Sequence, residues 1–121
     1  MLTAKTQPHQ LTRAACEPCK TGTKPMTKTG MAPYVESVKN WKLRKEKEID
    51  TLVREFEMKN FVTVIAAVDT IAALAEAEGH HPNIYIYNYK QLRVELSTHK
   101  IKGLSVNDFI LAAKIDAKLA M

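Results

Sequence analysis

Three of the four histidines lie in the second half of the chain and could exchange protons near neutral pH. They are His80, His81 and His99. Imidazole has an ordinary pKa of about 6.5, so it can give or accept a proton near pH 7. Two neighbouring imidazoles disfavour each other's second protonation, so that one can serve as an acid and the other as a base. Such a site suits elimination, hydration or isomerisation.

The residues between the doublet and His99 predict a β-hairpin that would bring the histidines together. The stretches N-I-Y-I-Y-N-Y and Q-L-R-V-E-L-S-T-H alternate in the manner of strands. A three-residue turn centred on Lys90 would pair residues whose numbers sum to 180. On that register Ile84 faces Leu96, and His81 faces His99 at the open end of the hairpin. A two-residue turn would offset the pair by one position.

Two acidic residues accompany the histidines, and each has a simpler interpretation. Glu76 precedes His80 by one helical turn and could accept an imidazole N–H, but it could equally be a solvated helix residue. Asp108 closes the sequence S-V-N-D, which has the form of a capping box. The doublet itself could supply favourable charge at a helix C-terminus. A metal site is the weaker alternative, because adjacent histidines rarely point at one ion.

The surrounding sequence predicts the order β-β-α-β-β-α. A helix is predicted from Asn60 to Glu78, with Asn60 as its N-cap and Gly79 ending it. Its predicted apolar stripe is Phe61, Val64, Ile65, Val68, Ile71, Ala72 and Ala75. Residues 41–48 and 52–58 predict two strands joined near Asp50. A last helix starts at Ser105, and residues 27–39 allow a short helix or one that starts at Pro33. Hairpins with helices on one face indicate an α+β sandwich.

Composition excludes several classes of protein. The chain has 121 residues, which fits one domain, and its net charge is +5. Residues 1–35 hold +4 of that charge, so the remaining residues are nearly neutral. A nucleic-acid-binding domain normally carries a basic patch, so we do not expect this domain to bind DNA or RNA. The four glycines form neither a dinucleotide-binding motif nor a P-loop. No apolar stretch is long enough to span a membrane.

The N-terminal residues are interpreted separately. Residues 1–26 contain three prolines and no sustained periodicity, so we expect an extended, poorly ordered basic arm before a domain of residues 27–121. Cys16 and Cys19, in C-E-P-C, are the only cysteines, and they form an incomplete zinc site or a pair of thiols in a mobile tail. No secretory signal is visible, so a cytoplasmic location is predicted, with a transit peptide as the alternative.

The histidine region resembles one particular family. The stretches E-A-E-G-H-H-P-N (76–83), S-T-H (97–99) and G-L-S-V-N-D-F-I-L-A-A-K-I (103–115) resemble the pterin-4a-carbinolamine dehydratases, including the spacing of eighteen between His81 and His99. The arm C-E-P-C is similar to the plant and protist branch. This resemblance covers roughly residues 25–120.

The resemblance implies a four-stranded antiparallel sheet with two main helices and a short N-terminal helix on one face, assembled as a dimer or tetramer. It implies loss of water from 4a-hydroxytetrahydrobiopterin, the product of aromatic amino acid hydroxylases, to give quinonoid dihydrobiopterin. The pterin is the substrate, so no cofactor and no metal is implied. The implied catalytic residues are His80, His81 and His99, and the implied substrate-binding or orienting residues are Glu76, Pro82, Ser97, Thr98 and Asp108. We expect His80 and His99 as the acid/base pair and His81 against the pterin.

Two functions of other classes stay open. Animal members of the family also act as dimerisation cofactors for a transcription factor, so the chain could be a non-catalytic interaction protein. An accessory role in molybdopterin metabolism is the other alternative. The three histidines favour the enzyme, because a purely structural role does not need them. The expected partners are therefore a pterin and further copies of this chain, without direct nucleic-acid or membrane binding.

Overall fold

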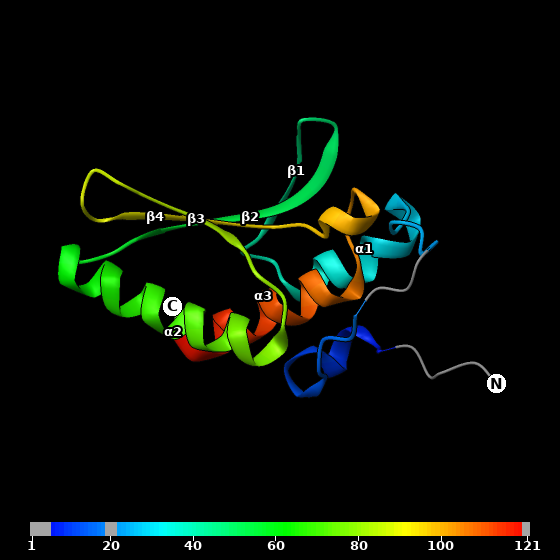
Figure 1. The fold of residues 1–121 in the computed structure, drawn as a ribbon, viewed down its shortest axis with the longest axis horizontal. Helices are drawn as coiled ribbons and strands as arrows, with labels where there is room; N and C mark the ends of the chain where they lie inside the picture. Colours follow the sequence, from blue (N-terminus) through cyan, green and yellow to red (C-terminus); the bar gives the residue numbers. More distant parts are fainter. Residues whose placement is uncertain (1–5, 19–21, 120–121) are drawn as a thin grey trace.

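The computed structural model describes residues 6–18 and 22–119, and they form one sheet covered by helices (Figure 1). The main helices are α1 (Lys28–Ser37), α2 (Phe61–Glu78) and α3 (Val106–Leu119). The strands are β1 (Lys42–Glu46), β2 (Ile49–Glu57), β3 (Asn83–Tyr87) and β4 (Gln91–Leu96). Two 3-10 helices, η1 (Pro8–Arg13) and η2 (His99–Ile101), complete the described elements.

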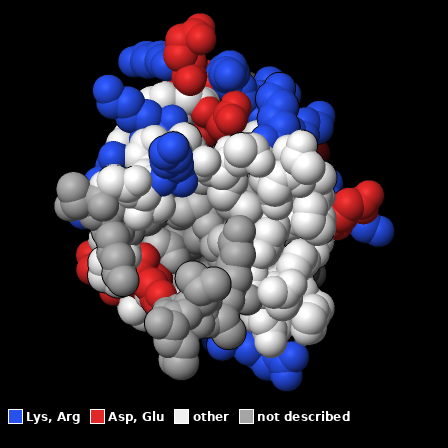
Figure 2. All heavy atoms as spheres, turned by 90° about the vertical axis from the view of Figure 1, so that its right-hand side faces the viewer, with Lys and Arg blue, Asp and Glu red and all other residues white. Residues whose placement is uncertain are grey.

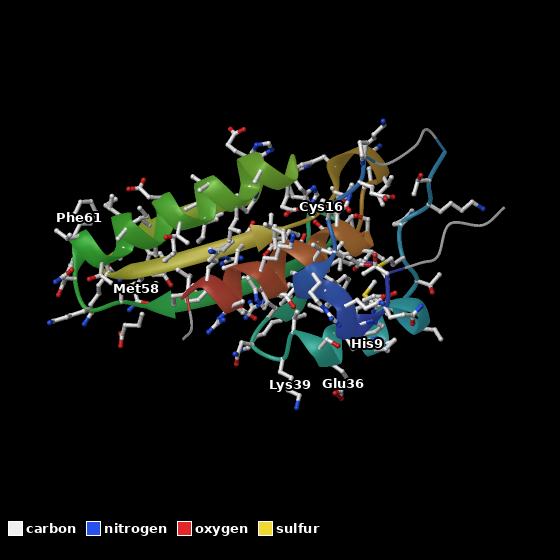
Figure 3. The ribbon with its side chains drawn as sticks, turned by 90° about the horizontal axis from the view of Figure 1, so that it is seen from below. His9, Cys16, Glu36, Lys39, Met58 and Phe61 are labelled. Atoms are coloured by element: carbon white, nitrogen blue, oxygen red, sulfur yellow. The ribbon has the colours of Figure 1, made fainter. Side chains whose placement is uncertain are left out.

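The sheet is antiparallel, with strand order β1-β2-β4-β3, and the helices lie on one of its faces (Figure 1). This confirms the predicted α+β fold. Seen from the helix side, α2 and α3 run side by side and η1 lies against α3 (Figure 3). The inner face of the sheet and α3 supply most of the fully buried side chains: Leu52, Leu92, Val94, Leu96, Phe109, Leu111 and Ile115. Among the described residues, no helix is long and apolar enough to cross a membrane.

Helix α2 has the predicted ends. The Asn60 side chain accepts a hydrogen bond from the Thr63 N–H at 2.9 Å, and Gly79 adopts the left-handed conformation with φ of 66°. The buried stripe is narrower than predicted: Val64, Ala67, Ile71 and Ala75 are buried, whereas Phe61 and Ile65 are exposed. Phe61 and Ile65 lie beside the buried stripe, so α2 has a second apolar face that is exposed.

The register of the β3–β4 hairpin differs from the prediction by two residues. Ile84 pairs with Val94 and not with Leu96, because the turn is centred on Tyr89. Asn88 and Tyr89 take positive φ values of 47° and 50°, which Asn tolerates better than most residues. Gln91 is therefore free to pair with Tyr87 on β3 as well as Glu57 on β2. A shift of two residues leaves every side chain on its predicted face.

His99 does not lie opposite His81 in a strand, so the predicted juxtaposition of the two residues in the ladder is wrong. Strand β4 ends at Leu96, and an isolated bridge between Thr98 and Gly103 turns the chain into η2. Gly103 packs so closely on Pro25 that a Cβ there would lie 2.5 Å from the proline Cβ. Because β4 has ended, His99 lies on the short helix η2 and not in a strand.

Two other local predictions are corrected. The β1–β2 turn is formed by Lys47 and Glu48, both at positive φ, and not near Asp50, which pairs with Lys45 inside the hairpin. Helix α1 starts at Lys28, where the Thr27 side chain accepts from the Gly30 N–H at 3.0 Å, so Pro33 lies inside the helix. The cap determines where the helix starts, and the exposed proline costs it one backbone hydrogen bond.

Residues 8–13 of the predicted arm are not extended. Residues 8–13 form η1, whose Leu11 is buried against the core, and the Tyr34 hydroxyl donates to the Thr6 carbonyl at 2.6 Å. Cys19 lies outside the described residues, so the predicted pair of thiols is described only at Cys16. The boundary at residue 26 between arm and domain stays a prediction.

Candidate functional site

A pocket of about 440 Å³ opens where four segments meet at one end of the sheet. The C-terminal end of α2, the end of β4 with η2, the first turn of α3 and residues 16–18 form its walls. The lining residues are Cys16, Glu17, Pro18, Glu78, Gly79, His80, His81, Ser97, Thr98, His99, Lys100 and Asn107. Figure 2 faces this end of the molecule, and along its upper edge acidic side chains stand among basic ones. The volume is within the range of small-molecule sites.

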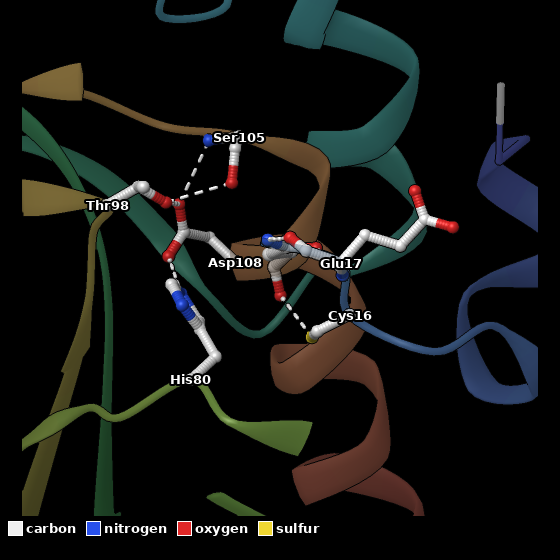
Figure 4. Close-up of polar contacts among 7 residues, drawn as sticks. Cys16, Glu17, His80, Thr98, Ser105 and Asp108 are labelled. Atoms are coloured by element: carbon white, nitrogen blue, oxygen red, sulfur yellow. Dashed lines mark hydrogen bonds and ion pairs between the residues drawn. The ribbon is translucent and has the colours of Figure 1, made fainter. Parts of the chain in front are cut away.

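His80 is the most constrained of the three histidines. Its Nε2 lies 2.6 Å from Oδ1 of Asp108, and the two side chains are 13% and 0% exposed (Figure 4). The other carboxylate oxygen, Oδ2, accepts from the Thr98 hydroxyl at 2.7 Å and from the Ser105 N–H at 2.9 Å. Since the single Thr98 proton goes to Asp108, the Ser105 hydroxyl donates to Thr98 over their 2.8 Å contact. Both oxygens of this buried carboxylate are thus bonded.

The predicted capping box is half formed. The Asp108 carboxylate accepts from the Ser105 backbone N–H, as the motif requires, but the Ser105 hydroxyl turns to Thr98. Asp108 therefore both starts α3 and holds His80. The Asp108–Nε2 contact leaves Nδ1 as the His80 nitrogen available to exchange a proton with a ligand.

The other predicted residues are arranged less tightly. His81 Nε2 lies 3.7 Å from Oε1 of Glu76, with exposed fractions of 61% and 81% for the two side chains. Glu76 thus accompanies His81 and not His80. His99 is exposed and lines the pocket with Ser97 and Thr98. Pro82 is not one of the described lining residues. The described residues contain no group of three His, Cys, Asp or Glu side chains that could hold a metal ion.

The N-terminal part of the pocket, from Cys16 to Pro18, and its acidic residue Glu78 were not predicted from the sequence. Burial alone would raise the pKa of Glu78, but hydrogen bonds from the Cys16 N–H and Lys114 lower it below its ordinary value. Burial, followed by the neighbouring Glu78, raises the pKa of the Cys16 thiol to about 12. The C-E-P-C motif was the only sequence signal for this N-terminal part of the pocket. Its spacing is typical of metal sites or redox thiols and does not indicate packing against a pocket.

The geometry supports proton transfer. A nearly buried imidazole is oriented by a fully buried carboxylate, and two more imidazoles border the same pocket. In this arrangement the carboxylate fixes which ring nitrogen is protonated and stabilises the imidazolium when it forms, as in other Asp–His pairs. One histidine can then donate a proton while another accepts one.

Comparisons with known proteins agree on one family. The family described as "Pterin 4 alpha carbinolamine dehydratase" matches residues 24–118. A relative from Halorhodospira halophila, provisionally named a pterin-4-alpha-carbinolamine dehydratase, is 40% identical over 108 residues, covering 88% of this chain and 95% of its own. The Arabidopsis thaliana "Pterin-4-alpha-carbinolamine dehydratase 2, mitochondrial" is 34% identical, covering 88% of this chain and 57% of its own.

A solved structure has a similar fold. The crystal structure of a "transcriptional coactivator/pterin dehydratase" from Brucella melitensis superimposes with a TM-score of 0.70 at 26% identity. It covers 78% of this chain and 97% of its own.

Proposed function

Because the chain belongs to the pterin-4-alpha-carbinolamine dehydratase family, we propose that it removes water from 4a-hydroxytetrahydrobiopterin to give quinonoid dihydrobiopterin. This would recycle the pterin cofactor of aromatic amino acid hydroxylases. The observation that supports the proposal most is His80, an imidazole held by the buried Asp108 in a pocket that His81 and His99 also line.

The elimination needs one proton donor and one acceptor. A protonated histidine gives its proton to the C4a hydroxyl, the C4a–O bond breaks and water leaves with the bonding electrons. The N5–H proton passes to a neutral histidine, and the N5–H electrons form the N5=C4a double bond. One proton is given and one is taken, so the enzyme ends with the same total charge. General acid–base catalysis of this kind is worth about 10²–10⁴ in rate.

We assign the acid/base pair to His80 and His99, and a binding role to His81. His80 has an oriented ring with Nδ1 left for the substrate, and His99, on η2, lines the same pocket. Ser97 and Thr98 border the substrate from the end of β4, and Glu76 would orient His81. Pro82, which follows the doublet, would help to fix the chain that supports His81. The reaction as written uses no metal and no cofactor, since the pterin itself supplies the electrons.

Stopped-flow absorbance of freshly generated 4a-hydroxytetrahydrobiopterin tests the proposal. The wild-type protein should accelerate dehydration, and His99→Ala should lose most of that acceleration while keeping its fold. Failure of a folded wild-type protein to accelerate the reaction would exclude this substrate. Equal acceleration by both proteins would keep the activity and remove His99 from the acid/base pair.

We also propose that the chain forms a homo-oligomer through the second apolar face of α2. Phe61, Val62 and Ile65 are exposed on this helix, and Tyr85 and Tyr87 are exposed on the edge strand β3. Large apolar side chains exposed on one helix face are typical of association surfaces. Sedimentation should show a dimer or tetramer for the wild type and a smaller species for Val62→Glu. A wild-type monomer at micromolar concentration would contradict the proposal.

Localisation stays a prediction. A cytoplasmic protein was expected from the sequence, and the name of the Arabidopsis relative places that protein in mitochondria. Fluorescent fusion of the full chain, compared with a fusion lacking residues 1–26, distinguishes the two compartments.

A further inference from the structure

One wall of the pocket comes from residues that precede the family match. Cys16, Glu17 and Pro18 line the pocket, whereas the family match starts at residue 24. Seen from the helix side, Cys16 lies beside the C-terminal end of α2, close to where the histidine doublet follows (Figure 3). We call residues 16–18 the N-terminal wall. The inference below rests on the proposed function, because it concerns how the same pocket binds a pterin.

Asn107 holds the N-terminal wall through both the carbonyl and the NH₂ of its side-chain amide. The Glu17 N–H donates to Asn107 Oδ1 at 2.9 Å, and Asn107 Nδ2 donates to the Glu17 carbonyl at 2.5 Å. The Cys16 Sγ also lies 3.5 Å from the Asn107 carbonyl. The Asn107 side chain thus bonds the Glu17 backbone N–H and carbonyl in the way that a neighbouring β-strand would. A segment without secondary structure is thereby fixed at two consecutive residues.

A second anchor comes from α2. The Cys16 N–H donates to Glu78 Oε1 at 2.8 Å, and Glu78 Oε2 accepts from Lys114 of α3 at 2.5 Å. Glu78 and Lys114 are both largely buried, at 13% and 17% exposed, so this bond is shielded from water. Hydrogen bonds to a charged group of this kind are stronger than those between neutral groups.

The anchors of the wall adjoin the residues that hold the imidazole. Asn107 is followed by Asp108, which binds His80, and Glu78 precedes His80 by two residues. The wall and His80 are therefore positioned by the same turn of α3 and the same end of α2. A displacement of the wall need not move His80, because the Asp108 contacts do not pass through residues 16–18.

The one charged side chain of the wall, that of Glu17, is turned away from His80 (Figure 4). The Glu17 backbone N–H is the group bonded to Asn107. The Cys16 thiol keeps its proton, since its pKa is about 12. A wall with a protonated thiol and a carboxylate turned aside offers no cation to an anion, and it suits a flat, uncharged heteroaromatic ring better.

From these contacts we propose that residues 16–18 form a pterin-binding wall of the site and that Asn107 is the positioning residue that keeps this wall in place. The N-terminal segment then contributes affinity for the substrate, while the acid/base chemistry stays with the histidines.

The test compares Asn107→Ala with Asn107→Asp in the full chain. The alanine variant loses both side-chain hydrogen bonds to Glu17, whereas the aspartate variant keeps an acceptor for the Glu17 N–H. We expect fluorescence titration with 7,8-dihydrobiopterin to give a Kd about five- to tenfold higher for Asn107→Ala and an intermediate value for Asn107→Asp. Asn40→Ala, which removes an exposed asparagine outside the pocket, should match the wild type.

A second readout reports on the wall itself. In a Cys19→Ser background, Cys16 is the single thiol of the chain, and iodoacetamide labels it only when it is accessible and deprotonated. Labelling should be slow in the parent protein, slower with bound pterin and at least tenfold faster in Asn107→Ala. Thermal unfolding of each variant confirms that the domain is intact.

The outcomes separate this inference from the proposed function. Rapid labelling of Asn107→Ala with an unchanged Kd overturns the inference, because the wall would then be released without loss of binding. Equally slow labelling in both proteins overturns the role of Asn107. If the folded wild type fails to bind 7,8-dihydrobiopterin, the proposed function fails and the wall is not a pterin wall. If the wild type binds and only the Asn107 variants lose affinity, both proposals are supported.

Discussion

His80 and His81 are neighbours in the sequence, yet they lie in different environments. His80 is 13% exposed and bonded to a fully buried carboxylate, whereas His81 is 61% exposed and 3.7 Å from an exposed one. The left-handed Gly79 ends α2 immediately before the doublet and turns the first imidazole inward toward α3. The doublet therefore places one oriented, largely buried imidazole beside one exposed imidazole.

The same contrast occurs two residues apart on α2. Glu78 accepts from the Cys16 N–H and Lys114, while Glu76 is 81% exposed and has only the distant contact with His81. Of these two carboxylates, the one that contacts α3 is held in a fixed position. Helix packing, and not proximity in sequence, therefore determines which members of this polar motif are held in place.

Among changes to the residues that position the imidazoles, breaking the contact between Asp108 and His80 should have the largest effect. Asp108→Asn replaces the carboxylate with an amide that cannot stabilise a protonated imidazole and that can present an N–H to Nε2. We expect kcat/KM for dehydration to fall about a hundredfold, within the range measured for general acid–base groups. Steady-state kinetics on wild type and variant, with thermal unfolding of both, measure this.

Ser105→Ala is the matched control for Asp108→Asn. It removes the hydroxyl that donates to Thr98 and leaves the Ser105 N–H and the His80 contact in place. Its kcat/KM should stay within about threefold of wild type. A loss as large as that of Asp108→Asn would mean that the whole polar network, and not the carboxylate, is required.

A smaller effect should come from Glu78 and should depend on pH. Its pKa is lower in the folded protein than the value of about 4.3 in an unfolded chain. The ionised carboxylate therefore adds stability above the unfolded pKa, and this stability is lost as the pH falls through the folded pKa. At pH 7 the Tm of Glu78→Gln should be lower than that of wild type, by the equivalent of about 1–3 kcal/mol. Near pH 3, as the wild-type carboxylate becomes protonated, the Tm difference should be smaller.

Thermal unfolding followed by circular dichroism between pH 3 and pH 7 measures the Glu78 effect, with Glu76→Gln as the matched variant on the same helix. Glu76→Gln should run parallel to wild type at every pH, since its side chain is exposed. A constant Tm difference between Glu78→Gln and wild type across the range would show that the charge of Glu78 adds no stability.

The smallest effect on catalysis is expected from changing the exposed carboxylate, Glu76. Exposed ion pairs contribute little, about 0–1 kcal/mol, so Glu76→Gln should change KM for the pterin by no more than about threefold and leave kcat near wild type. Steady-state kinetics with varied pterin measure this. A tenfold loss of kcat would place Glu76 in the chemistry and reverse the comparison of the two carboxylates.

Much of the fold could be predicted from the sequence, because local chemistry determines it. Asn60 and Gly79 mark the ends of α2, and period-2 alternation marks the strands. The three histidines and Asp108 were also identified beforehand, by a distinctive motif. That Asp108 binds His80, and not only the start of α3, depends on how α3 packs against the end of α2 and could not be read from spacing.

Other features could not be predicted because they depend on long-range contacts. The β3–β4 register depends on a turn at Asn88 and Tyr89 with positive φ at residues other than glycine. The N-terminal wall depends on bonds between residues about 60 and 90 positions apart, from Cys16 to Glu78 and from Glu17 to Asn107. An irregular segment held by two side chains has no periodicity that a sequence could reveal.

The most direct measurement is stopped-flow dehydration of 4a-hydroxytetrahydrobiopterin by wild type, His80→Gln and His81→Gln. We predict acceleration by wild type, a loss of about a thousandfold in kcat/KM for His80→Gln, and a loss of about tenfold for His81→Gln that appears mainly in KM. Equal losses for the two variants, or no acceleration by a folded wild-type protein, would contradict the conclusion that the Asp108-bound imidazole performs the acid/base chemistry of this site.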